Sequence, residues 1–368
     1  MSPQPLRRRI GQLLVGSFQG TDVPAEFRSF AREFDLGGVT LFRRLGNIES
    51  PEQVAALAFD VKRLGIESPA WVGIDQEGGR VARLRSPFTE WPPMAVLGRS
   101  EDSKLAARFA RALAAELSAV GISLDYAPVL DILTNSKNLV IGDRALGERP
   151  EQVARLGRVI IEELQRGGIA ACGKHFPGHG DTATDSHLEL PIVEHAPDRL
   201  RAVEFVPFKA AIEANVAFIM TAHVLVTAID DARPATLSPK IVQEILRNEL
   251  GFRGVIVSDD LEMKAIADGH SAAEAAVGAI AAGCDAALMC GQGKSADLQR
   301  QVQALEGLIH AVEQQRLPLT RVEDALARSR KAKEKFQREW RPPPAGQLRS
   351  VIGCDAHRAV ADEMSAFA

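Results

Sequence analysis

Short apolar runs alternate with longer segments of helical periodicity along most of the chain. Runs of this length, bounded by polar or glycine residues, predict buried strands. They are Leu13–Phe18, Gly38–Phe42, Ala70–Asp75, Ser123–Pro128, Ala170–His175, Ala217–His223, Gly254–Asp259 and Asp285–Met289. Apolar residues at helical spacing predict helices over Pro51–Leu64, Lys104–Val120, Glu151–Arg166, Arg199–Ala214, Pro239–Leu250 and Ala272–Ala282.

Repeated strand–helix alternation predicts an α/β fold with a parallel sheet. An open, doubly wound sheet is the alternative. The eight predicted strands, several of which end in polar residues, favour a closed (β/α)8 barrel of the TIM type in a single domain. In that fold the chemistry lies at the C-terminal ends of the strands.

The C-terminal part of the chain forms a short extension of the predicted barrel. A helical pattern around Thr320–Trp340 precedes Arg341 and three consecutive prolines, which stop a helix. We therefore expect residues 1–340 to form the catalytic domain and residues 341–368 to form a Pro-rich linker and tail. The amphipathic end of that tail either docks on the barrel or frays.

Composition restricts the possible functions. The chain has 368 residues, of which 46% are hydrophobic, and a net charge of −4, so nothing indicates binding to nucleic acid or to an anionic membrane. The apolar stretch near the N-terminus is interrupted by Gly11, Gln12, Gly16 and Ser17, which predicts a first strand rather than a secretory signal. The four cysteines have no CxxC spacing, and we expect free thiols in a cytoplasmic protein.

The segment from Lys174 to His187, KHFPGHGDTATDSH, is the richest in reactive side chains. Its histidines and aspartates fit three interpretations: a metal site that also uses His223, hydrogen bonds within the loop, or proton transfer. For His179 and Asp181 we favour hydrogen bonds within the loop. His187 is the candidate for proton transfer, because an imidazole gives and takes protons near neutral pH and Asp185 can orient it.

Two acids end the apolar run that begins at Gly254. Asp259 and Asp260 are adjacent, so in an extended chain they point to opposite sides. We choose Asp259 as the residue that faces the pocket and expect Asp260 to order the loop. The alternative is that both acids cap the following helix.

Two further glycine-framed segments carry charge. In DQEGGRVAR, Asp75 ends a predicted strand and can accept hydrogen bonds from sugar hydroxyls, while Arg80 and Arg83 either bind the same ligand or pair with acids. In GDRALG, Arg144 either binds an acyl oxygen or hydroxyl or forms an ion pair.

Together these segments resemble glycoside hydrolase family 3, and most closely its short bacterial branch of β-N-acetylglucosaminidases, which acts in cell-wall recycling. The matching pieces are GGVTLF, DQEGGRVARLR, FTEWPPMAVLG, LDYAPVLDI, GDRALG, KHFPGHGDTATDSH and FRGVIVSDDLEM. The KHFPGHG element followed by DSH is highly specific, whereas any other piece alone is a weak signal.

The resemblance implies a role for each matching position. Asp259 matches the family's nucleophile, His187 the acid/base of this branch, and Asp185 the partner of that histidine. The positions that match sugar-binding residues are Asp75, Arg83, Arg144, Lys174 and His175. Longer relatives take a glutamate from a second domain as acid/base, and the DSH element in its place favours N-acetylhexosaminides over glucosides.

The resemblance therefore implies a monomeric, retaining β-N-acetylglucosaminidase that releases terminal N-acetylglucosamine from peptidoglycan fragments and needs no metal or organic cofactor. Its expected partner is a small carbohydrate. The alternatives are a β-glucosidase or another family 3 glycosidase, an N-acetylglucosamine phosphorylase, and a metal-dependent barrel hydrolase. Substrate-assisted cleavage is a further alternative, but it needs two acids on one face, which the adjacent Asp259 and Asp260 do not supply.

Overall fold

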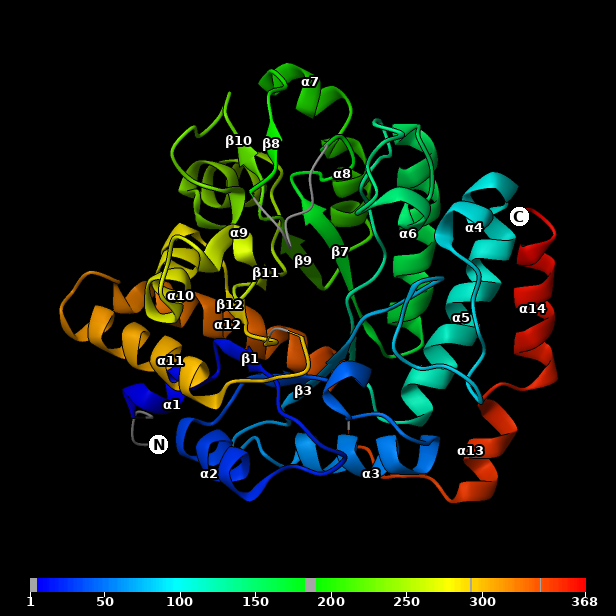
Figure 1. Ribbon diagram of the computed structural model, residues 1–368, viewed down its shortest axis with the longest axis horizontal. Helices are drawn as coiled ribbons and strands as arrows, with labels where there is room; N and C mark the ends of the chain where they lie inside the picture. The colour runs from blue at the N-terminus through cyan, green and yellow to red at the C-terminus, as the bar shows by residue number, and fades with distance from the viewer. Residues whose placement is uncertain (1–4, 183–189, 292, 338) are drawn as a thin grey trace.

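The computed structural model describes residues 5–182, 190–291, 293–337 and 339–368. Its eight parallel strands close into a barrel in the order β1-β12-β11-β9-β7-β6-β3-β2, surrounded by helices (Figure 1). The barrel strands are β1 (Leu14–Gly16), β2 (Gly38–Thr40), β3 (Trp71–Ile74), β6 (Leu124–Asp125), β7 (Ala170–Phe176), β9 (Phe218–Thr221), β11 (Val255–Asp260) and β12 (Ala286–Leu288). Each lies within or overlaps one predicted strand, so the predicted (β/α)8 barrel is confirmed and the open sheet is excluded.

Large apolar side chains fill the interior of the barrel below the strand ends. Trp71 and Phe218, which start β3 and β9, meet edge to face with ring centroids 5.2 Å apart. Above them Tyr126 is buried, and its hydroxyl lies 2.9 Å from the Thr40 Oγ1 atom. This packing closes the barrel from below, so a ligand can enter only at the C-terminal ends of the strands.

Helices cover the outside of the barrel, and the predicted ones are present with one difference. The longer ones are α2 (Ala25–Phe34), α3 (Pro51–Lys62), α5 (Ser103–Ala119), α6 (Pro150–Arg166), α8 (Phe205–Glu213), the π-helix over Lys240–Glu249, α10 (Ala272–Ala282), α11 (Leu298–Glu313) and α12 (Leu319–Phe336). The shorter ones are α1 (Leu6–Gly11), α4 (Met94–Ser100), α7 (Pro197–Ala202) and α9 (Lys264–Ala267).

The difference lies in the segment predicted as one helix over Arg199–Ala214, where the structure has α7 and α8 separated at Val203. The break lies four residues before Pro207. Proline has no N–H to donate to the carbonyl of residue i−4, and its ring collides with that carbonyl. The prediction of a continuous helix was wrong because it followed the apolar spacing and ignored this proline.

The C-terminal residues form α13 (Ala345–Val351) and α14 (Asp355–Ser365), which pack beside α5 (Figure 1). The buried carboxylate of Glu116 on α5 accepts hydrogen bonds from Gly353 N at 2.8 Å and pairs with His357 Nδ1 at 3.0 Å. The tail is therefore docked on the barrel, whereas the domain boundary at residue 340 remains a prediction. In the described part of the chain, no helix has the length and apolar character needed to cross a membrane.

A compact ion cluster lies at the N-terminal ends of the strands. Asp285, directly before β12, is fully buried and binds Arg247 at 2.6 Å, Arg321 at 2.5 Å and Arg328 at 3.0 Å. Charged groups at this end of a barrel stabilise the fold and take no part in catalysis. The active site is therefore expected at the opposite end of the barrel.

Candidate active site

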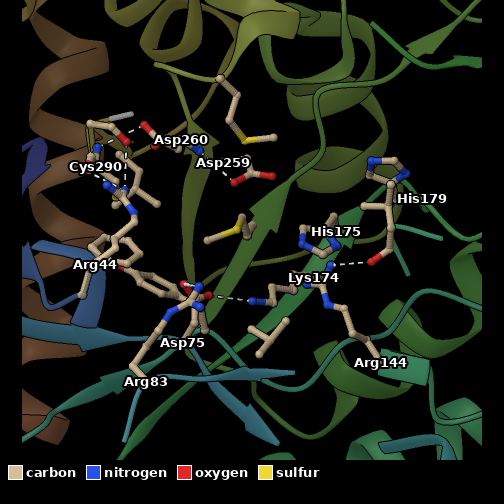
Figure 2. A pocket seen from close by; sticks show the side chains of 18 of the residues that line it. Arg44, Asp75, Arg83, Arg144, Lys174, His175, His179, Asp259, Asp260 and Cys290 are labelled. Atoms are coloured by element: carbon tan, nitrogen blue, oxygen red, sulfur yellow. Dashed lines mark hydrogen bonds and ion pairs between the residues drawn. The ribbon is translucent and has the colours of Figure 1, made fainter. Parts of the chain in front are cut away.

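A cavity of about 370 Å³ opens at the C-terminal ends of the barrel strands. It contains all of the sequence-predicted site residues that the structure describes: Asp75, Arg83, Arg144, Lys174, His175 and Asp259. They come from β3, β6, β7 and β11 and the segments that follow these strands, and they project into one space (Figure 2). Asp185 and His187 lie outside the described residues.

Ion pairs between side chains of opposite charge connect the segments that form one wall of the cavity. The ammonium group of Lys174, almost fully buried on β7, lies 2.9 Å from Asp75 Oδ1 and 2.6 Å from Glu77 Oε1. Glu77 also accepts two hydrogen bonds from the Arg144 guanidinium, at 2.8 and 2.9 Å. The second oxygen of Asp75 accepts a hydrogen bond from Arg83 at 3.0 Å. We call these five side chains the charge network.

A tight hairpin places the acids of the charge network. It consists of β4 (Gln76–Gly78) and β5 (Val81–Ala82), and its turn contains Gly78 and Gly79 with φ of 116° and 55°. Residues that carry a side chain rarely adopt such φ values, so glycine is required at these two positions. The Gln76 side chain accepts hydrogen bonds from the backbone N–H groups of Arg83 and Leu84, which fixes the far strand of the hairpin.

Charge pairing keeps the network ionised in spite of burial. Burial alone would raise the pKa of Glu77, but Arg144 and Lys174 outweigh it and lower that pKa to about 2. For Asp75 burial is likewise opposed by Lys174 and Arg83, which hold the pKa of this carboxyl well below its usual range. Burial would lower the pKa of Lys174, but its two carboxylates raise it. The wall thus presents fixed donors and acceptors, as sugar hydroxyls require.

Asp131 orders two histidines, His175 near the end of β7 and His179 just after this strand. Its buried carboxylate lies 2.6 Å from His175 Nδ1 and accepts a hydrogen bond of 2.6 Å from the backbone N–H of His179. The His179 ring contacts Thr182 Oγ1 at 2.7 Å, and burial lowers its pKa to about 4. His179 is therefore neutral at physiological pH and ties the loop to itself, which is the structural role expected for it.

Asp259 and Asp260 end β11 and differ in their contacts. Figure 2 shows the Asp259 carboxylate across the cavity from Asp75 and Lys174. Asp260 also lines the cavity, but its Oδ1 accepts hydrogen bonds from the backbone N–H groups of Glu262 and Cys290, at 3.1 and 3.0 Å. Burial, together with the nearby Glu262, raises the pKa of Asp260 to about 8 despite these two donors. Asp260 thus orders the loops around Asp259, and neither acid is a helix cap.

Three important residues of the site were not singled out from the sequence. Glu77 stands two residues after Asp75 in the DQEGGR segment, and alternation along a strand would place both side chains on one face. Asp131 is the next-to-last residue of the LDYAPVLDI segment, just beyond a predicted strand. Arg44 follows the GGVTLF segment and lines the cavity. For each, the available signal was a position just beyond a predicted strand.

The histidines considered as metal ligands are not arranged as a metal site. His175 and His179 line the cavity, but His223 is not among the lining residues and contacts Thr236 Oγ1 and the Asp260 carbonyl oxygen. Within residues 5–182, 190–291, 293–337 and 339–368, no group of three His, Cys, Asp or Glu side chains is placed to hold a metal ion.

A closed (β/α)8 barrel whose polar and charged side chains gather at the C-terminal ends of its strands has the arrangement of an enzyme active site. The glycosyl hydrolase family 3 N-terminal domain matches residues 5–331, and the chain belongs to this family. A β-hexosaminidase from Alkalilimnicola ehrlichii is 43% identical over 76% of this chain and 81% of its own length. One from Tolumonas auensis is 39% identical over 86% of this chain and 91% of its own length.

Solved structures agree with these relatives. A family 3 β-N-acetylglucosaminidase from Paenibacillus sp. superimposes with a TM-score of 0.92 at 37% identity, over 99% of this chain and 69% of the other. NagZ from Neisseria gonorrhoeae superimposes with a TM-score of 0.79 at 31% identity, over 97% of this chain and 98% of the other. The chain therefore spans nearly the whole length of that protein.

The Glu77→Gln variant tests the charge network. It removes the charge between Lys174 and Arg144 and leaves both buried cations short of a partner, so we expect the free energy of unfolding to fall by about 3–5 kcal/mol at pH 7. The pKa of Glu77 is lowered from 4.5 to about 2, so its contribution is complete above pH 4.5 and lost as the pH falls toward 2. Urea unfolding measured between pH 4.5 and pH 2 should show the free energies of unfolding of the unmodified protein and of Glu77→Gln converging as the pH falls.

The matched control is Asp143→Asn, which breaks the exposed Arg80–Asp143 pair of 3.0 Å. Exposed pairs contribute little, so this variant should change the free energy of unfolding by less than about 1 kcal/mol. Equal losses in Glu77→Gln and Asp143→Asn would contradict the central position given to Glu77.

Proposed function

We propose that the protein is a retaining β-N-acetylglucosaminidase that removes a terminal N-acetylglucosamine unit. One observation carries the proposal: the carboxylate of Asp259 lies in the same cavity as four side chains of the charge network, Asp75, Arg83, Arg144 and Lys174. The names of the relatives, β-hexosaminidase and β-N-acetylglucosaminidase, support the choice of sugar.

The charge network would bind the sugar by its hydroxyl groups. Asp75 is held by Lys174 and Arg83, and each of these bonds orients a polar atom that also lines the cavity. A hydroxyl both donates and accepts, so it can bridge a carboxylate and a neighbouring ammonium group. Arg144 and His175 complete the set of groups proposed to bind the sugar. Pre-ordering these groups lowers the entropic cost of positioning the anomeric carbon.

The proposed reaction is a double displacement. Asp259 attacks the anomeric carbon while protonated His187, oriented by Asp185, protonates the leaving oxygen. The bond from the anomeric carbon to that oxygen breaks, and an ester to Asp259 forms. Neutral His187 then removes a proton from water, which attacks the anomeric carbon, releases Asp259 and retains the configuration. An imidazole replaces the second carboxyl group of most retaining glycosidases.

The remaining expectations belong to the same proposal. They are a peptidoglycan-derived aglycone, a cytoplasmic location, a monomer without metal or organic cofactor, and catalysis by residues 1–340. The cytoplasm is a reducing compartment in which thiols stay unpaired. The free thiols of the structure, which are Cys172, Cys284, Cys290 and Cys354, support this location.

Trapping the covalent intermediate tests the role of Asp259. A 5-fluoro glycosyl fluoride that retains the 2-acetamido group should label the enzyme, because the fluorine slows hydrolysis of the ester. Peptide mapping should place the label on Asp259 and not on adjacent Asp260. Asp259→Ala should lose at least about a thousandfold in kcat, and Asp260→Asn should still be labelled at Asp259. A label on another residue would refute this assignment. An active enzyme that turns over at its full rate without ever becoming labelled would refute it as well.

Leaving-group dependence tests the role of His187. His187→Ala should lower kcat/KM by about a hundredfold or more for chitobiose, whose leaving oxygen needs a proton. The loss should be under about tenfold for 4-nitrophenyl N-acetyl-β-glucosaminide, which has a good leaving group. Asp185→Asn should also lower kcat/KM more for chitobiose than for the aryl glycoside, but by smaller factors than His187→Ala. Equal losses on both substrates would remove His187 from the acid role.

A further inference from the structure

His223 contacts the end of β11 from outside the cavity. It follows β9, it is fully buried, and it does not line the cavity. Its Nε2 atom lies 2.9 Å from the backbone carbonyl oxygen of Asp260, the last residue of β11. A carbonyl oxygen only accepts hydrogen bonds, so Nε2 carries the hydrogen and donates it. The imidazole therefore connects the segment after β9 to the residue that follows Asp259.

The other ring nitrogen of His223 is anchored as well. Its Nδ1 atom lies 2.8 Å from Thr236 Oγ1, in the short turn Ala235–Leu237. The Thr236 hydroxyl group is itself held, since it lies 2.9 Å from Thr221 Oγ1 and 3.0 Å from the Ala222 carbonyl oxygen. Both threonines are fully buried. Because both ring nitrogens have partners in a buried site, the orientation of the imidazole is fixed.

The end of β11 is the part of this strand where the pairing is irregular. Regular pairing with β9 ends at Val257. Pairing with β12 shifts its register between Val257 and Asp260. Ser258 and Asp259 lie within this irregular part, and irregularities of this kind redirect side chains beside active sites. Where the ladder is interrupted, contacts from side chains help to fix the backbone that carries the proposed nucleophile.

Asp260 passes its own position on to Asp259 through a direct hydrogen bond. Its backbone N–H donates to Asp259 Oδ1 at 2.8 Å, which orients the Asp259 carboxylate. Its own carboxylate accepts hydrogen bonds from the N–H groups of Glu262 and Cys290, and its carbonyl oxygen accepts the one from His223. A tilt of the Asp260 backbone would move its N–H group, and the Asp259 carboxylate would follow.

We propose that His223 is a positioning residue for the nucleophile. It holds the Asp260 backbone so that the N–H group of this residue keeps the Asp259 carboxylate directed into the cavity. Because His223 does not line the cavity, it acts through Asp260 and not on the sugar itself. Misplacing a reacting group by about 1 Å can cost about a hundredfold in rate. This inference rests on the proposed function, which makes Asp259 the nucleophile.

His223→Leu tests the positioning role, because leucine fills much of the same space and cannot donate a hydrogen bond. With 4-nitrophenyl N-acetyl-β-glucosaminide, kcat/KM should fall at least about tenfold, because the Asp259 carboxylate loses its orientation. The inhibition constant of N-acetylglucosamine should stay within about threefold, because the charge network is unchanged. His223→Gln places an amide N–H near the position of Nε2 and should retain at least about a third of kcat/KM.

The matched control is His357→Leu. His357 pairs with the buried Glu116 at 3.0 Å, but it belongs to α14 and does not line the cavity. This variant should lower the melting temperature and leave kcat/KM unchanged. A folded His223→Leu with full kcat/KM, equal losses in His223→Leu and His223→Gln, or an inhibition constant that rises in parallel would overturn the positioning role. If His223→Leu does not fold, His223→Asn decides by the same measurements, because its shorter side chain can reach Thr236 but not Asp260.

Failure of the proposed function gives a different result. In that case the unmodified protein would not cleave 4-nitrophenyl N-acetyl-β-glucosaminide at all. Crystal structures of the two His223 variants then decide whether this residue positions Asp259. A displaced Asp259 carboxylate in His223→Leu, without its 2.8 Å hydrogen bond from Asp260 N, and an unchanged one in His223→Gln would support the role. An unchanged carboxylate in His223→Leu, or an equal displacement in both variants, would overturn it.

Discussion

The site depends on one buried cation. Lys174 is almost fully removed from water, and its ammonium group is stabilised by Asp75 and Glu77 at 2.9 and 2.6 Å. An unpaired buried charge would cost several kcal/mol, so the lysine requires both acids and holds β3 and β7 in fixed relation. Arg83 then binds the other oxygen of Asp75, and Arg144 binds both oxygens of Glu77. The polar wall is thereby fixed before any ligand arrives.

This constraint explains how a common barrel acquires a particular chemistry. The neutral interior below Tyr126 is closed by packing, while the charges gather where the strands end. The two adjacent acids on β11 both line the cavity, but Asp260 accepts hydrogen bonds from two backbone N–H groups of the following segments, whereas Asp259 accepts one from the N–H of Asp260. Arg44 lines the same cavity and joins the segment after β2 to the segment after β12. The proposed chemistry thus depends on loops that a rigid barrel positions.

Much of this arrangement was predictable from the sequence, because strand–helix alternation and polar strand ends carry strong signals. The eight strands and the convergence of Asp75, Arg83, Arg144, Lys174, His175 and Asp259 followed from them together with the family resemblance. The break before Pro207 was missed because apolar spacing continues through it. The partners of Lys174 and the bridge from Arg44 depend on contacts between distant segments, which local patterns do not specify.

A crystal structure with N-acetylglucosamine bound would test the central claim most directly. The account predicts hydroxyl groups of the sugar on Asp75 and Lys174 and the anomeric carbon facing the Asp259 carboxylate. A sugar bound in the reverse orientation, or in a cavity that does not include Asp259, would contradict it.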